Sequence, residues 1–444
     1  MERRNRMQLH VENFAKIKEA DIEIEGITVI AGENNTGKST IGKLLYCFFN
    51  VFYNYEDRLY KQKVSALKER INNSIKVTQI ISSQGRIVRK LGNFNKDLLD
   101  KFVDLFISHY HMDISLKEYA DVCQAFFQSN ENYHIEVDDY DVFIKQIFFI
   151  LSVEKDKEIN QLMLLSLNTE FHNQYLPLDN TNDVHVTLEI KSGNISFDIT
   201  NSQQFMNVKT YRVLHNEIIY YDNPFVVDKL SKESFSHVMK FALDNEKEGI
   251  FVNHLDYMSI LLNKPSYMNK SNIYNQILSD NIILDIEKEI MTSVHGDIVY
   301  EDGEFKFKEK NLDVALNMCN LSTGVKSFIV LLKLIKDFKI VENGTIILDE
   351  PEIHLHPKWQ LKYAELLVLL QKTLNLHILI NSHSPYFINA IEVYSAKHKI
   401  ADRCKYYLAD LDKENRAYFE DVTTNIDKIY CKLSQPLLDL EDVL

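Results

Sequence analysis

The chain has 444 residues, of which 45% are hydrophobic and 26% charged, and its formal net charge is −14. These proportions are those of a folded globular protein and exclude a disordered, collagen-like or fibrous chain. The acidic balance excludes a global basic field, so any contact with nucleic acid must come from a local patch.

Targeting signals and cysteine motifs are absent from the sequence. No apolar run reaches the ~18 residues that a membrane-spanning helix needs, and the N-terminus lacks the apolar core of a signal peptide. The five cysteines are scattered and form no Cys-x-x-Cys pair. We therefore expect a cytoplasmic protein with no membrane association, no disulfide framework and no zinc site.

Three short strands are predicted near the N-terminus. Residues 8–11 and 21–24 alternate polar and apolar side chains, as half-exposed antiparallel strands do. Residues 27–31 form a nearly continuous apolar run, which is typical of a strand buried on both faces. A glycine-bearing loop follows, and a helix is predicted from about Lys38.

The middle of the chain mixes helical segments with strands. Residues from about 61 to 180 have a helical pattern, and so do residues from about 228 to 294. Between and after these segments, strands are predicted at 184–190, 195–199, 217–221, 298–300 and 305–307.

The C-terminal third alternates helix and strand. The predicted order is a helix at 324–340, a strand at 345–348, a helix at 358–373 and a strand at 377–380. This alternation is typical of an α/β fold with a mostly parallel sheet.

The loop after the first buried strand carries the strongest motif. Its sequence, Gly32 to Ser39, fits the phosphate-loop pattern G-x-x-x-x-G-K-[ST] without a mismatch. Such a loop wraps backbone N–H groups around phosphate oxygens, and the helix N-terminus behind it favours bound anions. Lys38 would reach the β- and γ-phosphates, and the Ser39 hydroxyl would ligate Mg²⁺. The predicted nucleotide contacts are Gly32, Asn34, Asn35, Thr36, Gly37, Lys38, Ser39 and Thr40.

Two carboxylates, Asp349 and Glu350, end the apolar strand predicted at 345–348. The carboxyl ends of strands are where α/β sheets bind ligands. Asp349 is therefore predicted to hold Mg²⁺, and Glu350 to orient or deprotonate a water molecule. His383 follows the next strand at the same edge, where it could contact a γ-phosphate.

The segment from Leu321 to Gly324, Leu-Ser-Thr-Gly, opens the helix predicted at 324–340. By itself it is consistent with a simple helix N-cap. Its place in the chain changes that interpretation. The order is phosphate loop, Leu-Ser-x-Gly, Asp-Glu-Pro and then a strand-terminal histidine.

In this order of motifs the chain resembles an ABC-like ATPase head of the SMC, RecF and OLD-type branch. The segments 11–17 and 349–360 resemble that branch too. The resemblance is specific over roughly 7–60 and 310–395. It is loose over the strands at 184–224 and absent from the helical segments.

The resemblance implies an α/β ABC-type head with a mostly parallel core sheet, an antiparallel β lobe and helical insertions. The head would comprise residues 1–60, 181–227 and 298–444, with insertions at 61–180 and 228–297. ATP and Mg²⁺ would be the cofactors. The roles implied are catalysis by Glu350, His383 and Lys38, metal binding by Ser39 and Asp349, and contact with ATP on a second copy by Leu321, Ser322, Thr323 and Gly324.

The chain departs from transporter members of the superfamily at several positions. Thr323 and Val325 replace the second glycine and the glutamine of the transporter signature, and His356 stands where transporters usually carry an aspartate. No glutamine clearly marks the Q-loop. By topology, Asp222 and Asn223 are the candidates for that position.

The length of the insertions narrows the function that the resemblance implies. Between the strand at 217–221 and Ser322 there are only ~70 helical residues, too few at 1.5 Å each for a chromosome-tethering arm. The 61 residues after His383 are too few for an OLD-type nuclease domain.

We therefore expect an ATPase that forms an ATP-sandwich homodimer and regulates a separately encoded effector, such as a nuclease or toxin. Compact heads of this kind resemble ATPase components of bacterial anti-phage systems. Two alternatives stay open, a RecF-like DNA-repair ATPase that clamps DNA and a nucleotide-gated scaffold with little turnover. Salt-dependent DNA binding would identify the first, and tight dimerisation without turnover the second.

Overall fold

The computed structural model describes residues 7–83, 86–91, 96–128, 133–137, 139–177, 183–191, 193–200, 205–230, 237–238, 240, 251–263 and 273–441. It divides into two compact bodies. The first comprises Met1–Asn54, Asn160–Asp244 and Phe251–Leu444, and the second comprises Tyr55–Ile159 and Asn245–Ile250. Within the described ranges, no helix combines the length and the apolarity needed to cross a bilayer.

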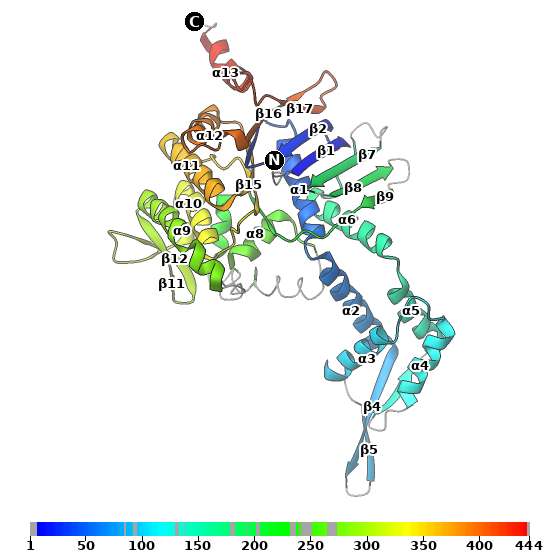
Figure 1. The fold of residues 1–444 in the computed structure, drawn as a ribbon. Coiled ribbons are helices and arrows are strands. Elements are labelled where there is room, and N and C mark those ends of the chain that lie inside the picture. The colour runs from blue at the N-terminus through cyan, green and yellow to red at the C-terminus, as the bar shows by residue number, and fades with distance from the viewer. Residues whose placement is uncertain are drawn as a thin grey trace. The chain divides into compact units, whose positions relative to one another are not determined.

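The first body is built on one sheet of eleven strands in the order β10-β14-β15-β3-β16-β17-β2-β1-β7-β8-β9 (Figure 1). Its strands are β1 (Met7–Phe14), β2 (Ile17–Ile24), β3 (Ile27–Gly32), β7 (Val184–Ile190), β8 (Gly193–Thr200), β9 (Phe205–Thr210), β10 (Ile218–Tyr221), β14 (Thr345–Asp349), β15 (His377–Ser382), β16 (Cys404–Leu411) and β17 (Ala417–Asp421).

Five of these strands, from β10 to β16 in the sheet order, run parallel and form the core. Every residue of β3, β14 and β15 is buried, as their unbroken apolar runs predict. The other strands complete the sheet largely in antiparallel pairs, and β17 joins them to the core by pairing with both β16 and β2. The predicted fold class, an ABC-type α/β head with an antiparallel lobe, is confirmed.

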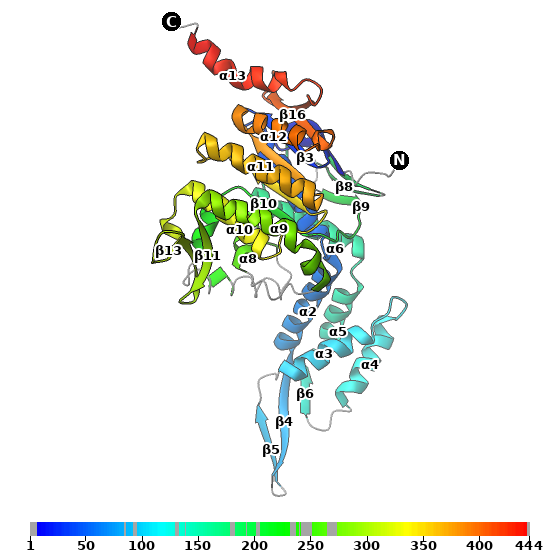
Figure 2. The same ribbon diagram turned by 60° about the vertical axis from the view of Figure 1, so that its left-hand side comes forward.

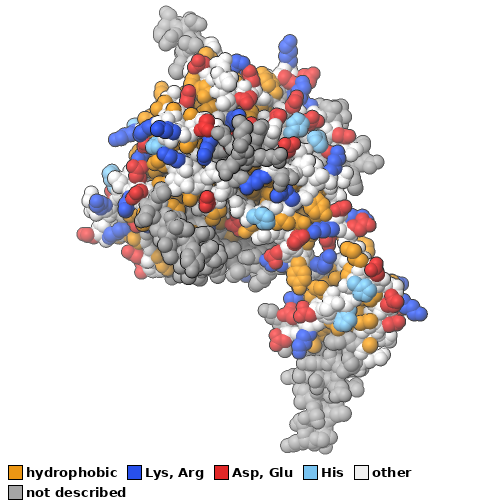
Figure 3. Space-filling model, viewed as in Figure 1, with side chains coloured by type: hydrophobic (Ala, Val, Ile, Leu, Met, Phe, Trp, Pro, Cys, Tyr) orange, Lys and Arg blue, Asp and Glu red, His pale blue; other side chains and the backbone are white. Residues whose placement is uncertain are grey.

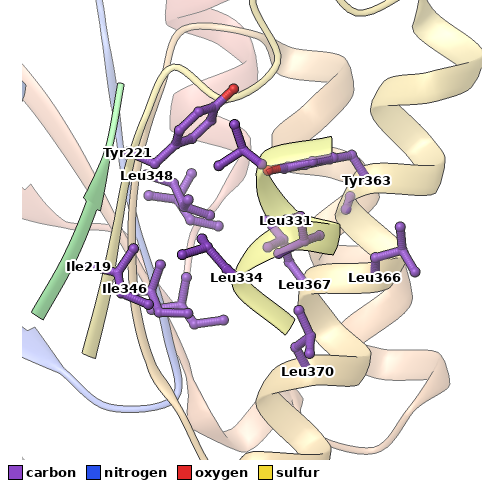
Figure 4. Close-up of a cluster of buried hydrophobic side chains, with 14 of the residues drawn as sticks. Ile219, Tyr221, Leu331, Leu334, Ile346, Leu348, Tyr363, Leu366, Leu367 and Leu370 are labelled. Carbon is purple, nitrogen blue, oxygen red and sulfur yellow. The ribbon is translucent and has the colours of Figure 1, made fainter. Parts of the chain in front are cut away.

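Helices cover both faces of the parallel core. One face packs against α10 (Thr323–Lys336), α11 (Pro357–Leu374) and α12 (Pro385–Lys397), of which α11 and α12 lie side by side (Figures 1 and 2). Figure 4 shows this layer, with Tyr221 and Leu348 of the sheet facing Leu331 of α10 and Tyr363 of α11. The other face packs against α1 (Lys38–Phe52).

The remaining elements of the first body flank this core. They include a three-stranded sheet and several helices: β11 (Gly296–Glu301), β12 (Glu304–Glu309), β13 (Leu316–Asn317), α8 (His254–Asn263), α9 (Ile273–Val294), α13 (Asp427–Glu441) and the short 3-10 helices η1 (Pro224–Leu230), η3 (Met318–Asn320) and η4 (Ala401–Arg403). The turn between β11 and β12 uses Asp302 and Gly303 with positive φ, as a tight two-residue hairpin turn requires.

The second body has its own apolar core, in which Phe102, Phe106 and Phe143 are fully or almost fully buried. Its elements are α2 (Tyr55–Ser74), β4 (Ile75–Ser83), β5 (Arg86–Leu91), α3 (Lys96–Ser108), α4 (Leu116–Gln128), β6 (Tyr133–Val137), α5 (Tyr140–Ser152) and the start of α6 (Lys155–Phe171). A helical segment was expected here, but three antiparallel strands also form. The β-branched residues that open β4 favour this conformation.

Candidate functional site

The phosphate loop connects β3 to α1. Gly32 ends the strand, and a Cβ there would lie 2.4 Å from the carbonyl oxygen of Ala409 on β16. Gly37, the residue before α1, has φ of 84°, a left-handed conformation that favours glycine. Between them the Thr36 hydroxyl donates to the carbonyl of Glu33 at 2.8 Å. Asn34, Asn35 and Ser39 are exposed, so the loop presents its outer surface to solvent.

Lys38 is buried and extends along the inside of the loop. Its ammonium donates to the carbonyl oxygens of Gly32 at 2.9 Å and Glu33 at 2.6 Å. Burial lowers the pKa of Lys38, and the nearby carboxylates of Glu350 and Asp349 oppose that shift. The amine is thus held by carbonyls that a phosphate can replace, rather than by a direct carboxylate partner.

The strand register brings the loop and the two carboxylates to one edge of the sheet. Ser382 of β15 pairs with Ala31 of β3, and Asp349 of β14 pairs with Asn381 of β15. Parallel strands in this register end together, as the sequence predicts for the carboxyl edge.

Asp349 is buried and surrounded by donors. Its Oδ1 accepts from Nδ2 of Asn381 at 3.1 Å, and its Oδ2 accepts from the hydroxyl of Tyr220 at 3.1 Å. Burial raises the pKa of Asp349, whereas hydrogen bonds from Ser39, Asn381 and Tyr220 oppose that rise. The two predicted metal ligands, Ser39 and Asp349, therefore lie close together at this edge.

Glu350 and His383 form a pair at the same edge. Nδ1 of His383 lies 3.1 Å from Oε1 of Glu350. This hydrogen bond lowers the pKa of Glu350 and raises the pKa of His383. Glu350 has φ of 49°, an uncommon conformation for this residue type, and its N–H donates to the carbonyl of Asn381 at 2.8 Å. The structure thus joins the predicted water-orienting carboxylate to the predicted phosphate contact.

Glu352 is a further residue of this edge, one to which no role was assigned from sequence. Only 3% of it is exposed, and its Oε1 accepts from the Ser382 hydroxyl and from the N–H of His383. Burial raises the pKa of Glu352. These bonds hold the loop that carries His383. In the sequence, the position of Glu352 two residues after Glu350 was the signal that could have identified it as a residue of this site.

The residues present fit a nucleotide with Mg²⁺. A hydroxyl and a carboxylate are hard oxygen ligands, which suit Mg²⁺ together with phosphate oxygens and water. The described residues contain no cluster of three or more His, Cys, Asp or Glu that could hold a metal without such help. Lys38 and the loop before α1 supply the positive groups that phosphates need.

The signature segment lies at the start of α10. Ser322 is exposed and stands at the N-cap without a side-chain capping bond. Gly324 packs against α11, where a Cβ would lie 2.9 Å from the Trp359 ring. Among the described residues, no hydrogen bond joins Leu321, Ser322, Thr323 or Gly324 to the phosphate loop of the same copy.

The two Q-loop candidates have partners of their own. Asp222 pairs with His254, and Asn223 accepts from the N–H of Phe225. His356, the departure from the transporter pattern, caps α11 by accepting from the N–H of Lys358. Thr40 lies in the first turn of α1, where its N–H donates to the carbonyl of Gly37.

The fold and this edge define an ABC-type ATPase head. The chain belongs to the AAA ATPase domain family, whose model matches residues 7–388. By family it is therefore an ATPase, and nucleotide binding goes with that membership.

One relative is named "Retron Vc95 probable ATPase", from Vibrio cholerae serotype O1 biovar El Tor. It is 22% identical over 235 residues, which is 49% of this chain and 42% of the relative. The chain thus spans less than half the length of that protein.

Solved structures of SMC heads are also similar. The SMC head domain from Thermotoga maritima matches with a TM-score of 0.37 at 10% identity, covering 94% of this chain and 99% of that one. An SMC head from Pyrococcus furiosus, solved with the C-terminal domain of ScpA, matches with a TM-score of 0.39 at 11% identity, covering 98% of each chain. Both likenesses are too distant to carry an argument of their own.

Proposed function

We propose that the carboxyl edge of the core sheet binds Mg-ATP and hydrolyses it. The observation that carries this proposal is the convergence of Lys38, Asp349 and the Glu350–His383 pair at the ends of three adjacent parallel strands. Three segments far apart in the sequence supply these groups, and each has the chemistry that phosphoryl transfer needs.

Each residue has one part in this scheme. Lys38 and the loop N–H groups bind the β- and γ-phosphates, and Ser39 and Asp349 hold the metal. Bound there, Mg²⁺ would neutralise charge that develops on the phosphate oxygens. Glu350 orients and deprotonates the attacking water, and His383 contacts the γ-phosphate.

The proposal extends to a dimer in which two heads close on two ATP molecules. Ser322 and Gly324 of each copy would contact the nucleotide of the other. The Ser322 side chain supports the proposed dimer. It is exposed, and within the described chain its hydroxyl makes no capping hydrogen bond to the helix. Because ATP would make these contacts only in the closed state, it would shift the equilibrium towards that state.

The dimer would regulate a separately encoded effector, such as a nuclease or toxin, in anti-phage defence. A relative named as a retron probable ATPase supports this setting. The net charge of −14 favours a protein partner over direct clamping of DNA. On the face in Figure 3, basic and acidic side chains are mixed over the described residues.

The experiment for the dimer is light-scattering mass with and without Mg-ATP, on purified wild type and Glu350→Gln without DNA. We expect ATP to double the mass of both proteins, with Glu350→Gln staying assembled for longer. A mass that ATP changes in neither protein would contradict the ATP-sandwich.

The effector role needs a test in cells. Phage plaque counts would be compared on cells that express the chain with its neighbouring genes, as wild type or as Lys38→Ala. We expect protection to require wild-type Lys38. Equal protection by both would contradict regulation by ATP.

A further inference from the structure

A second polar network adjoins Asp349, the proposed metal ligand, on the face of the sheet that α1 covers. Neighbouring residues of a strand point to opposite faces, and Tyr220 and Tyr221 of β10 do so. Tyr221 belongs to the apolar layer under α10 and α11 (Figure 4). Tyr220 is 1% exposed, and its hydroxyl donates to Oδ2 of Asp349 at 3.1 Å.

Gly42 of α1 lies directly against this tyrosine, and its lack of a side chain leaves room for the Tyr220 hydroxyl. A Cβ on Gly42 would lie 3.2 Å from the Tyr220 hydroxyl and 3.1 Å from Cγ2 of Ile347. Such contacts are tighter than most real Cβ contacts, so a larger residue at Gly42 would displace its neighbours. Helix α1 thus approaches the sheet closely where the hydroxyl meets Asp349.

His254, the first residue of α8, holds the other side of the Tyr220 ring. The two rings stack with centroids 4.3 Å apart and an interplanar angle of 23°. His254 is itself clamped: Nδ1 lies 2.5 Å from Oε1 of Glu170, and Nε2 lies 3.0 Å from Oδ2 of Asp222. Its backbone N–H also donates to Oε2 of Glu170 at 3.0 Å.

The contacts with Glu170 and Asp222 favour a charged imidazole, because both ring nitrogens of a histidine can donate hydrogen bonds only in the protonated form. Burial by itself would lower the pKa of His254, but the bonds to Asp222 and Glu170 raise it to about 9. His254 and Glu170 are 4% and 3% exposed. Buried ion pairs often contribute little to stability compared with apolar residues of the same size. Packing alone therefore does not account for this cluster.

We propose that Tyr220 is a positioning residue for Asp349, and that His254, held by Glu170 and Asp222, acts through Tyr220. This inference rests on the proposed function, in which Asp349 holds the metal. Asn381 donates to one carboxylate oxygen and Tyr220 to the other, so the carboxylate plane is fixed from both sides. Each oxygen keeps lone pairs for a cation.

The expected size of the effect follows from other metal sites. Removing a hydrogen-bond partner of a metal ligand typically weakens metal binding by roughly 10–100-fold. Tyr220→Phe removes only the hydroxyl and keeps the ring that stacks on His254. Tyr221→Phe is the matched control, since it makes the same change on the opposite face of the same strand.

The experiment measures metal binding directly, with Mn²⁺ as the probe. Free Mn²⁺ is followed by electron paramagnetic resonance during titration into protein saturated with ADP, and ADP affinity is measured separately in EDTA. We expect Tyr220→Phe to weaken Mn²⁺ binding about tenfold and Tyr221→Phe to leave it within about twofold. Metal-free ADP affinity should stay within about twofold in both variants, because Tyr221 lies on the opposite face of the strand and the Tyr220 hydroxyl meets the phosphate loop only through a long contact, 3.5 Å, with the Ser39 carbonyl.

Two outcomes separate this inference from the proposed function. If wild type binds Mn²⁺ with ADP and Tyr220→Phe binds it equally well, the positioning role is wrong while the nucleotide site stands. If wild type shows no metal-dependent nucleotide binding at all, the proposed function itself fails.

The part played by His254 is tested by non-additivity. His254→Gln should weaken Mn²⁺ binding in the wild-type background by several-fold and have no further effect in Tyr220→Phe, because residues that act through one another do not add. Additive losses would overturn the claim that His254 acts through Tyr220. If His254→Gln does not fold, the double variant His254→Gln/Glu170→Gln replaces it, since it buries a neutral pair in place of an unpaired carboxylate.

Discussion

The two edges of the parallel core differ in what their polar groups do. At the carboxyl edge, β14 and β15 end in Asp349 and Ser382, next to the paired Glu350 and His383. At the amino edge, β15 begins with His377, where burial lowers the pKa of the imidazole to about 4.

Two histidines at opposite ends of β15 therefore behave differently: His377 opens the strand, and His383 directly follows it. His383 shares a hydrogen bond that raises its pKa, whereas His377 is buried and stays neutral at pH 7. The role of each histidine therefore depends on which end of the strand it occupies. The one at the carboxyl edge belongs to the candidate site, and the one at the amino edge is a packed, neutral side chain. The four predictions below test this division, beginning with the largest effect.

Lys38→Ala should remove nucleotide binding at the carboxyl edge. The Lys38 ammonium is buried inside the phosphate loop, on the carbonyl oxygens of Gly32 and Glu33. Charge-assisted hydrogen bonds contribute about 1.5–3 kcal/mol each, so loss of contacts to two phosphates predicts affinity weaker by about 100-fold or more. Calorimetric titration with a non-hydrolysable Mg-ATP analogue, which carries both phosphates, measures this, with Lys43→Ala on the same helix as the control. Unchanged affinity in Lys38→Ala would overturn the loop assignment.

Glu350→Gln should keep nucleotide binding and lose turnover. The amide can still accept from His383 but cannot take a proton from water. General bases typically contribute about 10²–10⁴-fold to rate, so we expect turnover to fall by about 100-fold or more. A phosphate-release assay at saturating ATP gives the rate, and the titration used for Lys38 gives the affinity. Wild-type turnover in this variant would remove Glu350 as the base.

Ser322→Arg tests whether ATP hydrolysis at the carboxyl edge requires a second copy of the chain. If Ser322 contacts ATP on the other protomer, a long cation there should block closure and reduce turnover on the order of tenfold, with ADP affinity of the single copy retained. Thr292→Arg, at an exposed position on α9, is the control. Normal turnover in Ser322→Arg would indicate that this segment only starts a helix.

Much of the first body could be predicted because its strands have unambiguous patterns. The apolar runs at 27–31 and 345–348 became buried parallel strands, and the alternating segments became antiparallel ones. The strands β16 and β17 were not predicted. Tyr406 and Tyr407 of β16 have an ambiguous pattern, and its neighbours in the sheet are distant in sequence.

The candidate site shows the same limit. Lys38 and Asp349 stand in recognisable local motifs, so their joint location followed from the rule that parallel strands end together. Tyr220 stands in no motif, and its contact with Asp349 joins β10 to β14, strands that are neighbours in the sheet but not consecutive in sequence. Glu352 lies within the recognisable segment after Asp349, but its contact with Ser382 depends on how the turn after β14 folds back on β15, and only the fold reveals it.

His377→Gln tests the amino edge, where we expect the smallest effect and no change in catalysis. In the folded chain the pKa of His377 is about 4, below the ~6.5 of an unfolded histidine, so the unfolded state binds a proton first as pH falls. Stability from this group is therefore complete above about pH 6.5 and is lost towards pH 4, amounting to about 2 kcal/mol between pH 7 and pH 5. Thermal unfolding of the first body at both pH values should show a smaller acid-induced loss in His377→Gln than in wild type. His215→Gln, at an exposed histidine, should behave as wild type, and an equal acid-induced loss in all three proteins would show that His377 is not the neutral buried group that distinguishes this edge.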